Sequence, residues 1–176
     1  DHGMKELTMK EETFIFLDEL INKKDTSVVM VNGGTQTHLY FDNAAKKDSV
    51  YKLLQSKEKN FRVYKKEDFP AAWNFQSARA GDLLLAARPG FYFREGSRPH
   101  FLERVQMGAL FGVHGYDPAE VPDMGGIFYA NGPNIQKGVK LPPLENIHVY
   151  PLLAKILGLP LPAIDGSFEK VRQVYK

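Results

Sequence analysis

The chain has 176 residues, of which 43% are hydrophobic and 25% are charged, and its formal net charge is +2. This composition is typical of a folded globular protein, and the length fits one domain or two small lobes. The small net charge does not indicate binding to a nucleic-acid polymer, the absence of cysteine excludes disulfide and thiolate chemistry, and no apolar run approaches the length of a membrane span.

The first part of the chain, up to about residue 75, alternates strand-like and helix-like patterns. β-Branched and aromatic runs favour strands, and apolar residues at helical spacing favour helices. In chain order the predicted elements are a strand at 13–17, a short helix at 18–23, strands at 27–31 and 37–41 joined by an Asn-Gly-Gly turn, a helix at 44–59 and a strand at 61–64. The order strand, helix, hairpin, helix, strand is that of a ferredoxin-like βαββαβ unit.

The later part of the chain contains two continuous apolar runs and one helical pattern. The runs at residues 81–87 and 126–130 predict strands buried on both faces, as in a parallel sheet flanked by helices. Residues 149–157 predict a helix with Pro151 in its first turn, which Gly158 terminates.

The histidines are the first candidates for a site, and there are five of them: His2, His38, His100, His114 and His148. His38 alternates with apolar neighbours in a predicted strand and is expected to be a surface or packing residue. His100 follows a proline in a polar loop, and His148 lies beside a helix start. Neither of these two is expected to be a metal ligand.

His2 and His114 differ from the others because a glycine follows each of them, and Asp1 also precedes His2. Glycine lets the backbone turn sharply and lets an ion approach closely. A carboxylate together with imidazoles suits zinc or a similar divalent ion. The residues alone leave two interpretations open, namely a divalent-metal site and two accidental His-Gly pairs.

Other polar and aromatic residues near these motifs are expected to have structural roles. Tyr116, Asp117 and Asn131 lie in predicted turns and are expected to shape loops. The aromatic run at 91–93 is expected to pack in a core, and Trp73 is expected to pack at a seam between two parts of the chain.

A series of short motifs matches a known family in order. They are Asp-His-Gly-Met at 1–4, His-Gly-Tyr-Asp at 114–117, Pro-Asp-Met at 122–124, Ala-x-Gly-Pro at 130–133, Pro-Pro-x-Glu-Asn-x-x-x-Tyr-Pro at 142–151, Leu-Gly-Leu at 157–159 and Asp-Gly at 165–166. With these motifs the chain resembles the type I phosphodiesterase/nucleotide pyrophosphatase family of the alkaline phosphatase superfamily. The resemblance covers residues 1–4 and about 81–166, and residues 8–75 match only in position.

The resemblance implies an α/β fold with a partial alkaline-phosphatase-like core. Residues 1–8 and 76–176 would form this core. Residues 9–75 would form an inserted α+β capping lobe of the ferredoxin-like βαββαβ type.

The resemblance also implies a site with two zinc ions. Asp1 and His2 match the adjacent pair that binds one zinc, and His114 matches a late histidine that binds the other. The nucleophilic threonine and the remaining ligands of the family would lie upstream of Asp1, so no catalytic residue is assigned in this chain. The chain is therefore expected to be a C-terminal portion of the catalytic domain, inactive alone and without tightly bound zinc.

In the complete enzyme the resemblance implies hydrolysis of phosphodiester or pyrophosphate bonds through a phosphothreonine intermediate, with a nucleotide or another phosphodiester as substrate. It also implies export to the periplasm or the cell exterior, and open strand edges make a homo-oligomer plausible. Two alternatives stay open. One is a non-catalytic structural or interaction module, and the other is a different hydrolase of the superfamily, such as a phosphomonoesterase or a phosphonate hydrolase.

Overall fold

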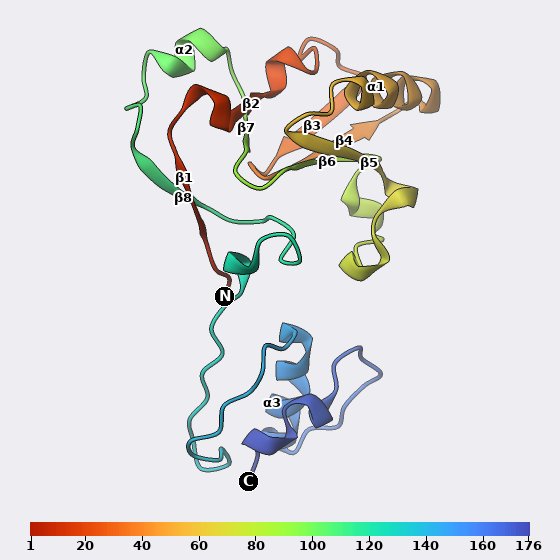
Figure 1. The fold of residues 1–176 in the computed structure, drawn as a ribbon. Coiled ribbons are helices and arrows are strands. Elements are labelled where there is room, and N and C mark those ends of the chain that lie inside the picture. The colour runs from red at the N-terminus through yellow and green to blue at the C-terminus, as the bar shows by residue number, and fades with distance from the viewer. The chain divides into compact units, whose positions relative to one another are not determined.

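The structure is a computed structural model that describes residues 1–176. The chain divides into two units, Asp1–Ile127 and Phe128–Lys176 (Figure 1). The first unit contains all the strands and two α-helices, and the second contains one α-helix and several short 3₁₀ turns. The predicted mixed α/β class is confirmed. The predicted division into a core and an insertion at 9–75 stays a prediction.

A four-stranded antiparallel sheet lies at the centre of the first unit. Its strands follow the spatial order β3 (Val28–Asn32), β4 (Gln36–Phe41), β6 (Leu83–Ala87) and β5 (Phe61–Lys65). Strands β3 and β4 form the predicted hairpin, with Val28 opposite Phe41. The Gly34 amide donates a hydrogen bond of 2.9 Å to the side chain of Asn32, which fixes the turn between them.

Strand β6 corresponds to the apolar run predicted to be buried on both faces. Its residues Leu83, Leu84 and Leu85 are almost fully buried, so this prediction is confirmed. The prediction of a parallel sheet is wrong, because both neighbours of β6 run antiparallel to it. Leu83 and Leu85 pack in one cluster with a helix, whereas Leu84 packs beneath Phe69 on the other face. A strand is buried on both faces whenever other segments pack on each face of its sheet. Burial therefore does not distinguish a parallel from an antiparallel strand.

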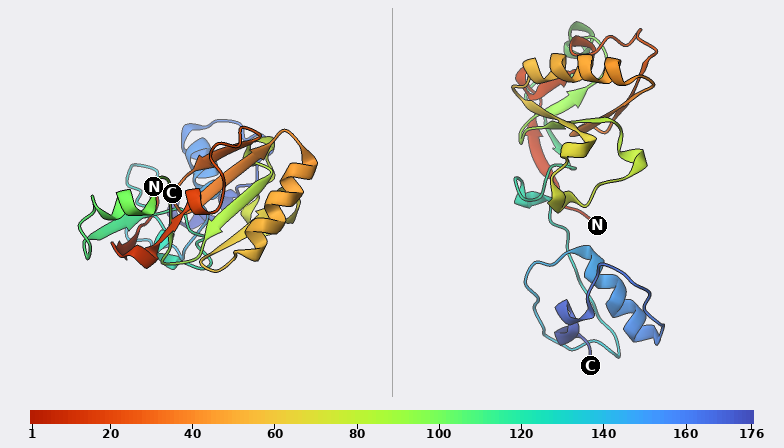
Figure 2. Two further views of the ribbon diagram at one scale, coloured as in Figure 1. Left: turned by 90° about the horizontal axis from the view of Figure 1, so that it is seen from above. Right: turned by 90° about the vertical axis from the view of Figure 1, so that its right-hand side faces the viewer.

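Helix α1 (Ala44–Ser56) is the predicted helix and lies along one face of the sheet (Figure 2). It begins where the Lys46 amide donates a hydrogen bond of 3.1 Å to the Asn43 side chain. The other helix predicted in this region, at 18–23, is instead a single 3₁₀ turn at Leu17–Glu19. Six residues give too few hydrogen bonds to offset the cost of starting an α-helix.

The remaining elements of the first unit form two smaller pairs. Strand β2 (Phe14–Phe16) pairs in parallel with β7 (Tyr92–Arg94), outside the four-stranded sheet. Strand β1 (Lys5–Thr8) pairs antiparallel with β8 (Leu110–Val113), and α2 (Arg98–Leu102) lies between β7 and β8 in the chain. The predicted strand at 13–17 therefore forms, but β6 takes its place in the sheet.

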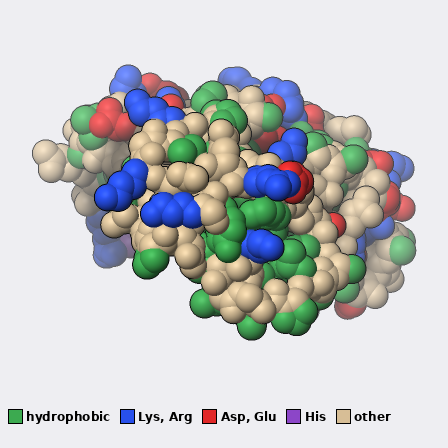
Figure 3. Space-filling model, turned by 90° about the horizontal axis from the view of Figure 1, so that it is seen from below, with side chains coloured by type: hydrophobic (Ala, Val, Ile, Leu, Met, Phe, Trp, Pro, Cys, Tyr) green, Lys and Arg blue, Asp and Glu red, His purple; other side chains and the backbone are tan.

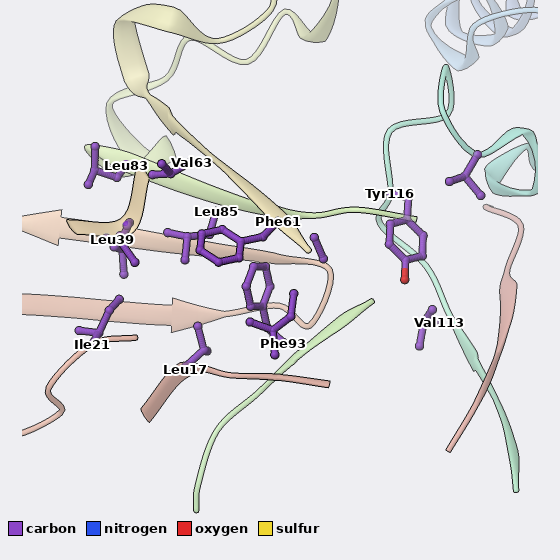
Figure 4. Packing of buried hydrophobic residues seen from close by; sticks show 14 of the residues in the cluster. Leu17, Ile21, Leu39, Phe61, Val63, Leu83, Leu85, Phe93, Val113 and Tyr116 are labelled. Carbon is purple, nitrogen blue, oxygen red and sulfur yellow. The ribbon is translucent and has the colours of Figure 1, made fainter. Parts of the chain in front are cut away.

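The first unit has one main hydrophobic core. Figure 4 shows side chains from the sheet, such as Leu39 and Phe61, pointing toward Phe93 of β7 and Leu17 of the adjoining turn. A second cluster gathers the aromatic rings around Phe14. The core thus fastens β7 and the 3₁₀ turn to the sheet.

In the second unit, α3 (Val149–Leu157) has the predicted bounds. Gly158 ends it in the left-handed conformation with φ of 66°, as the sequence predicts. Leu152 of α3 packs against the C-terminal residues Val171 and Val174. Local signals for a helix start and stop were sufficient here.

The strand predicted at 126–130 is wrong, because these residues are extended but unpaired. Their large side chains are exposed, with Ile127 at 95% and Tyr129 at 84%. An apolar run indicates a tendency to form a strand, but a strand needs a partner to complete its hydrogen bonds.

At the surface, basic, acidic and hydrophobic side chains lie among one another, and one hydrophobic patch is visible on the face drawn in Figure 3. Several charges form ion pairs, including Arg62 with Glu120 at 2.9 Å and Arg98 with Glu19 at 2.7 Å. No helix of the structure has the length and apolar character that crossing a membrane requires.

Candidate metal site

The antiparallel pair of β1 and β8, here called the β1–β8 ribbon, brings two distant motifs together. In its register Lys5 lies opposite Val113. His2 precedes the first strand by two residues, and His114 follows the second strand directly. Both histidines therefore lie at the same end of the ribbon, although almost the whole first unit separates them in the sequence.

The imidazole rings of His2 and His114 are stacked, with centroids 4.0 Å apart and planes inclined by 26°. The Nδ1 atom of His2 lies 2.8 Å from the carbonyl oxygen of Gly3. Because a carbonyl oxygen only accepts hydrogen bonds, Nδ1 carries the proton and donates it. The Nε2 atom of His2 lies 3.7 Å from Oδ2 of Asp1, and in the neutral imidazole it would carry the lone pair that can bind a metal ion.

Asp1, His2 and His114 are here called the histidine cluster. Its side chains are open to solvent, with exposed fractions of 92% for Asp1 and 41% for His2. A carboxylate oxygen and an imidazole nitrogen thus lie close together, beside a second imidazole. These donor atoms suit zinc. No group of three or more His, Cys, Asp or Glu side chains in the structure is arranged to hold a metal ion, and the histidine cluster by itself does not form such a group.

Both glycines that follow the histidines are required by the backbone. Gly115 has φ of 95°, a conformation that favours glycine, and a Cβ there would lie 2.5 Å from Oγ1 of Thr35. At Gly3 a Cβ atom would overlap the carbonyl oxygen of Asp123, so only glycine fits there. The sharp turn expected after His114 is present, whereas the glycine after His2 makes room for the backbone of Asp123.

The Pro-Asp-Met motif supports the segment that carries His2. It forms a 3₁₀ turn at Pro122–Met124, and the carbonyl oxygen of Met124 accepts a hydrogen bond of 2.9 Å from the Gly3 amide. Lys5 pairs with Asp123 at 2.6 Å. Gly126 passes so close to Asp1 that a Cβ there would lie 2.7 Å from the Asp1 carbonyl oxygen. The motif could be recognised in the sequence, but the sequence did not predict that it positions His2.

Thr35 and Gln36 position the segment that carries His114, and sequence reasoning missed both. The hydroxyl of Thr35 donates to the His114 carbonyl oxygen at 2.8 Å, and the Gln36 amide donates to the Gly115 carbonyl oxygen at 2.9 Å. Both residues lie at the hairpin end of β4. Thr35 and Gln36 donate to backbone carbonyl oxygens, which every residue has. The residue types at 114 and 115 therefore could not indicate these hydrogen bonds in advance.

Tyr116 and Asp117 have the structural roles that the sequence predicts. Tyr116 is buried and its hydroxyl donates to the Phe91 carbonyl oxygen at 2.6 Å. Burial raises the pKa of this phenol to about 12. Asp117 accepts hydrogen bonds of 2.8 Å from the indole of Trp73 and from the Ala119 amide. Trp73 therefore joins two parts of the first unit, as expected of a packing residue at a seam.

The other three histidines have separate local surroundings. Nδ1 of His38 lies 2.7 Å from the Ala80 carbonyl oxygen, a packing role as predicted. His148 accepts a hydrogen bond of 3.1 Å from the Ser167 amide beside the start of α3. His100 was predicted to lie in a loop, which is wrong, since Ser97 and Pro99 start the short helix α2 around it.

Comparison with known proteins places these features in a family context. A family profile described as "Type I phosphodiesterase / nucleotide pyrophosphatase" matches residues 1–117. The human "Ectonucleotide pyrophosphatase/phosphodiesterase family member 5" is 30% identical over 175 residues, which is 99% of this chain and 34% of that protein. Family member 7 from rat is 29% identical over 169 residues, which is 94% of this chain and 36% of that protein.

Solved structures give the same result for the fold. The human ectonucleotide pyrophosphatase/phosphodiesterase 5 superposes with a TM-score of 0.83 at 29% identity, over 99% of this chain and 43% of that one. An inactive threonine-to-alanine variant of the murine protein, in complex with AMP, superposes with a TM-score of 0.81 at 27% identity, over 100% of this chain and 44% of that one. The chain spans about a third of the length of the curated relatives it matches.

Proposed function

This chain belongs to the type I phosphodiesterase/nucleotide pyrophosphatase family, and from that premise we propose that its histidine cluster is part of a two-zinc hydrolase site. The observation that carries the proposal is the stacking of His2 on His114 at 4.0 Å, with Asp1 beside them. Asp1 and His2 would hold one zinc ion, and His114 would hold the other. The remaining ligands and the nucleophilic threonine would come from residues outside this chain.

When bound, two zinc ions would supply the positive charge that stabilises the oxygens of a phosphoryl displacement and lowers the pKa of a threonine hydroxyl. The residues of this chain would position those ions. The Gly3 carbonyl oxygen orients the His2 ring so that Nε2 faces the Asp1 carboxylate. Thr35 holds the backbone of His114 in place. The nucleophilic threonine would attack phosphorus and displace the leaving alcohol or phosphate by breaking its P–O bond. Water would then break the bond between threonine and phosphorus and release the phosphorylated product.

We propose a nucleotide, or another phosphodiester or pyrophosphate, as the substrate class. The AMP complex of the murine relative supports a nucleotide. The prefix in the names of the ectonucleotide relatives supports a location outside the cell. Both statements concern the complete enzyme and not this chain alone.

Metal binding tests the ligand assignment directly in this chain. We expect weak binding of Co²⁺ or Zn²⁺, because a site loses affinity steeply when ligands are missing. In an NMR titration with Co²⁺, the imidazole signals of His2 and His114 should broaden at lower metal concentration than those of the other histidines. His2→Ala and His114→Ala should each weaken this effect at the remaining ring.

The matched control is His100→Ala, which removes an exposed imidazole outside the cluster. It should leave the titration of His2 and His114 unchanged. Equal broadening of all five histidines, or a titration that His2→Ala and His114→Ala do not alter, would show that the cluster is not a metal site.

Hydrolysis separates the catalytic proposal from a non-catalytic module. This chain with excess zinc and a chromogenic phosphodiester should show no turnover, because no nucleophile is assigned in it. In a longer protein that adds the missing ligands and the threonine, turnover should appear, and His114→Ala should abolish most of it. Full turnover with His114→Ala, with two zinc ions still bound, would overturn the ligand assignment.

A further inference from the structure

A second candidate site lies in the first unit, in a cavity of about 560 Å³. Its floor is formed by Leu84 and Ala86 of β6, on the face of the sheet opposite α1. Its walls are the segment around Trp73 and the turn at residues 115–120. Pockets that bind small molecules have volumes of roughly 300–1,000 Å³, so this cavity, here called the Arg88 cavity, is of suitable size.

Asp1, His2 and His114 do not line the cavity, although Thr35, Gln36 and Gly115, which adjoin His114, do. The cavity contains two arginines with different environments. Arg62 is neutralised by Glu120 at 2.9 Å. Arg88 has no ion-pair partner, and its Nε atom is fully covered by protein and has no hydrogen-bond partner. A covered donor without a partner is unfavourable, most of all on a charged group, so the Arg88 guanidinium is left with unused hydrogen-bond donors.

The carboxylate of Asp117 does not fill that role. Its Oδ2 accepts from the Trp73 indole and its Oδ1 accepts from the Ala119 amide, both at 2.8 Å. The only other acidic side chain of the lining, Glu120, is paired with Arg62. An anion that enters the cavity could therefore pair with the Arg88 guanidinium. The carboxylates of Asp117 and Glu120 already accept hydrogen bonds from other groups.

The wall beside Arg88 is aromatic and is held in place before any ligand binds. The rings of Tyr64 and Trp73 meet edge to face with centroids 5.2 Å apart, and Phe75 stacks on Phe69 with planes inclined by 13°. The indole bond to Asp117 fixes the orientation of Trp73. Rigid aromatic walls bind flat apolar groups at a low cost in conformational entropy.

We propose that the Arg88 cavity binds a small organic anion, in which a carboxylate or phosphate pairs with the Arg88 guanidinium and a flat aromatic body lies against Trp73. A guanidinium binds either oxyanion through two parallel hydrogen bonds, so the two headgroups share one chemistry. The proposal does not depend on the zinc site, because different residues carry it.

Trp73 is the only tryptophan of the chain, so its fluorescence reports on this cavity alone. The experiment titrates the 176-residue chain with phenyl phosphate and with benzoate, in the presence of a chelator that removes zinc. Inorganic phosphate tests the anion without the aromatic body, and benzyl alcohol tests the body without the anion. We expect saturable changes with one or both aromatic anions, and at least tenfold weaker binding of the two partial probes.

Two variants assign the interaction to Arg88. Arg88→Gln should weaken binding of the aromatic anion by about tenfold or more, since it removes a charged hydrogen-bond donor. Arg79→Gln, which removes an exposed guanidinium outside the lining, is the control and should bind normally. Arg88→Lys keeps the charge without the planar fork, and its affinity should lie between those of the wild type and Arg88→Gln.

A readout on the unmodified protein keeps the test independent of folding in the variants. The guanidinium signals of Arg88 in a ¹⁵N spectrum should shift when the anion binds. Absence of this shift at millimolar ligand, equal affinity in Arg88→Gln, or equal affinity for benzyl alcohol would overturn the proposal. Loss of zinc-dependent hydrolysis with intact anion binding would affect only the proposed function.

Discussion

The four-stranded sheet and the histidine cluster lie in the same unit and show opposite physical character. In the sheet, leucine side chains of β6 are buried on both faces and each of its strands is paired. In the histidine cluster, polar side chains face solvent, and contacts from separate segments hold the backbone that carries them. The sheet is therefore stabilised by contacts within the chain. The proposed chemistry of the histidine cluster would need further residues from outside the chain.

The largest effect should come from the centre of the sheet. Leu85→Ala removes a fully buried side chain from β6 and should lower the free energy of unfolding by about 2–5 kcal/mol, measured by urea denaturation. His2→Ala is the contrasting variant from the cluster and should change it by less than about 0.5 kcal/mol. Similar losses for the two variants would contradict the separation of stability from the site.

A smaller loss is expected where the cluster depends on backbone conformation. Gly115→Ala places a side chain at φ of 95° and brings a Cβ close to Oγ1 of Thr35. The free energy of unfolding should fall by about 1–3 kcal/mol, and the stacking of His114 on His2 should be disturbed. Gly108→Ala is the control, because Gly108 also has positive φ but a Cβ there meets no atom within 4 Å. If the two variants lose the same stability, the contact with Thr35 contributes nothing.

Thr35→Val tests whether the sheet positions the cluster. The substitution keeps the shape of a buried side chain but removes the donor to the His114 carbonyl oxygen, at a cost of about 1–2 kcal/mol. The NMR signals of the His114 ring should shift, while those of His38 in the same strand should not. Unchanged His114 signals would show that Thr35 does not position this residue.

The smallest effect concerns the partly exposed carboxylate of Asp25, which lies just before β3. Hydrogen bonds from Lys46 and Ser27 lower the pKa of Asp25 to about 2. A lowered pKa stabilises the fold at pH values above the ordinary value near 3.8, and this contribution is lost as the pH falls through about 2. An NMR titration should give the lowered pKa in the wild type, and Lys46→Gln should raise it. A midpoint near 3.8 in the wild type would exclude the interaction.

Sequence reasoning succeeded where the determinants are local. The start and end of α3 follow from Pro151 and Gly158, and the hairpin of β3 and β4 follows from the Asn-Gly-Gly turn. It failed where a partner decides the outcome. The run at 126–130 has no partner strand, and β6 pairs antiparallel although its burial pattern also fits a parallel sheet.

The candidate site divides in the same way. Asp1, His2 and His114 could be selected because imidazole and carboxylate groups beside glycine carry recognisable chemistry. Thr35, Gln36 and the turn at Pro122–Met124 could not be selected, because they act through backbone atoms and leave no mark in the residue types they contact. Their positions follow only from the register of the sheet and of the β1–β8 ribbon.

The β1–β8 ribbon has a kinetic consequence. It closes a loop that runs from Thr8 to Leu110 and contains the entire four-stranded sheet. Closing so long a loop is entropically unfavourable in an unfolded chain, and contacts between distant residues slow folding. We infer that the sheet folds first and shortens the distance between the two ends, so that His2 meets His114 late in folding. Variants that slow formation of the sheet would then delay assembly of the histidine cluster without touching any of its residues.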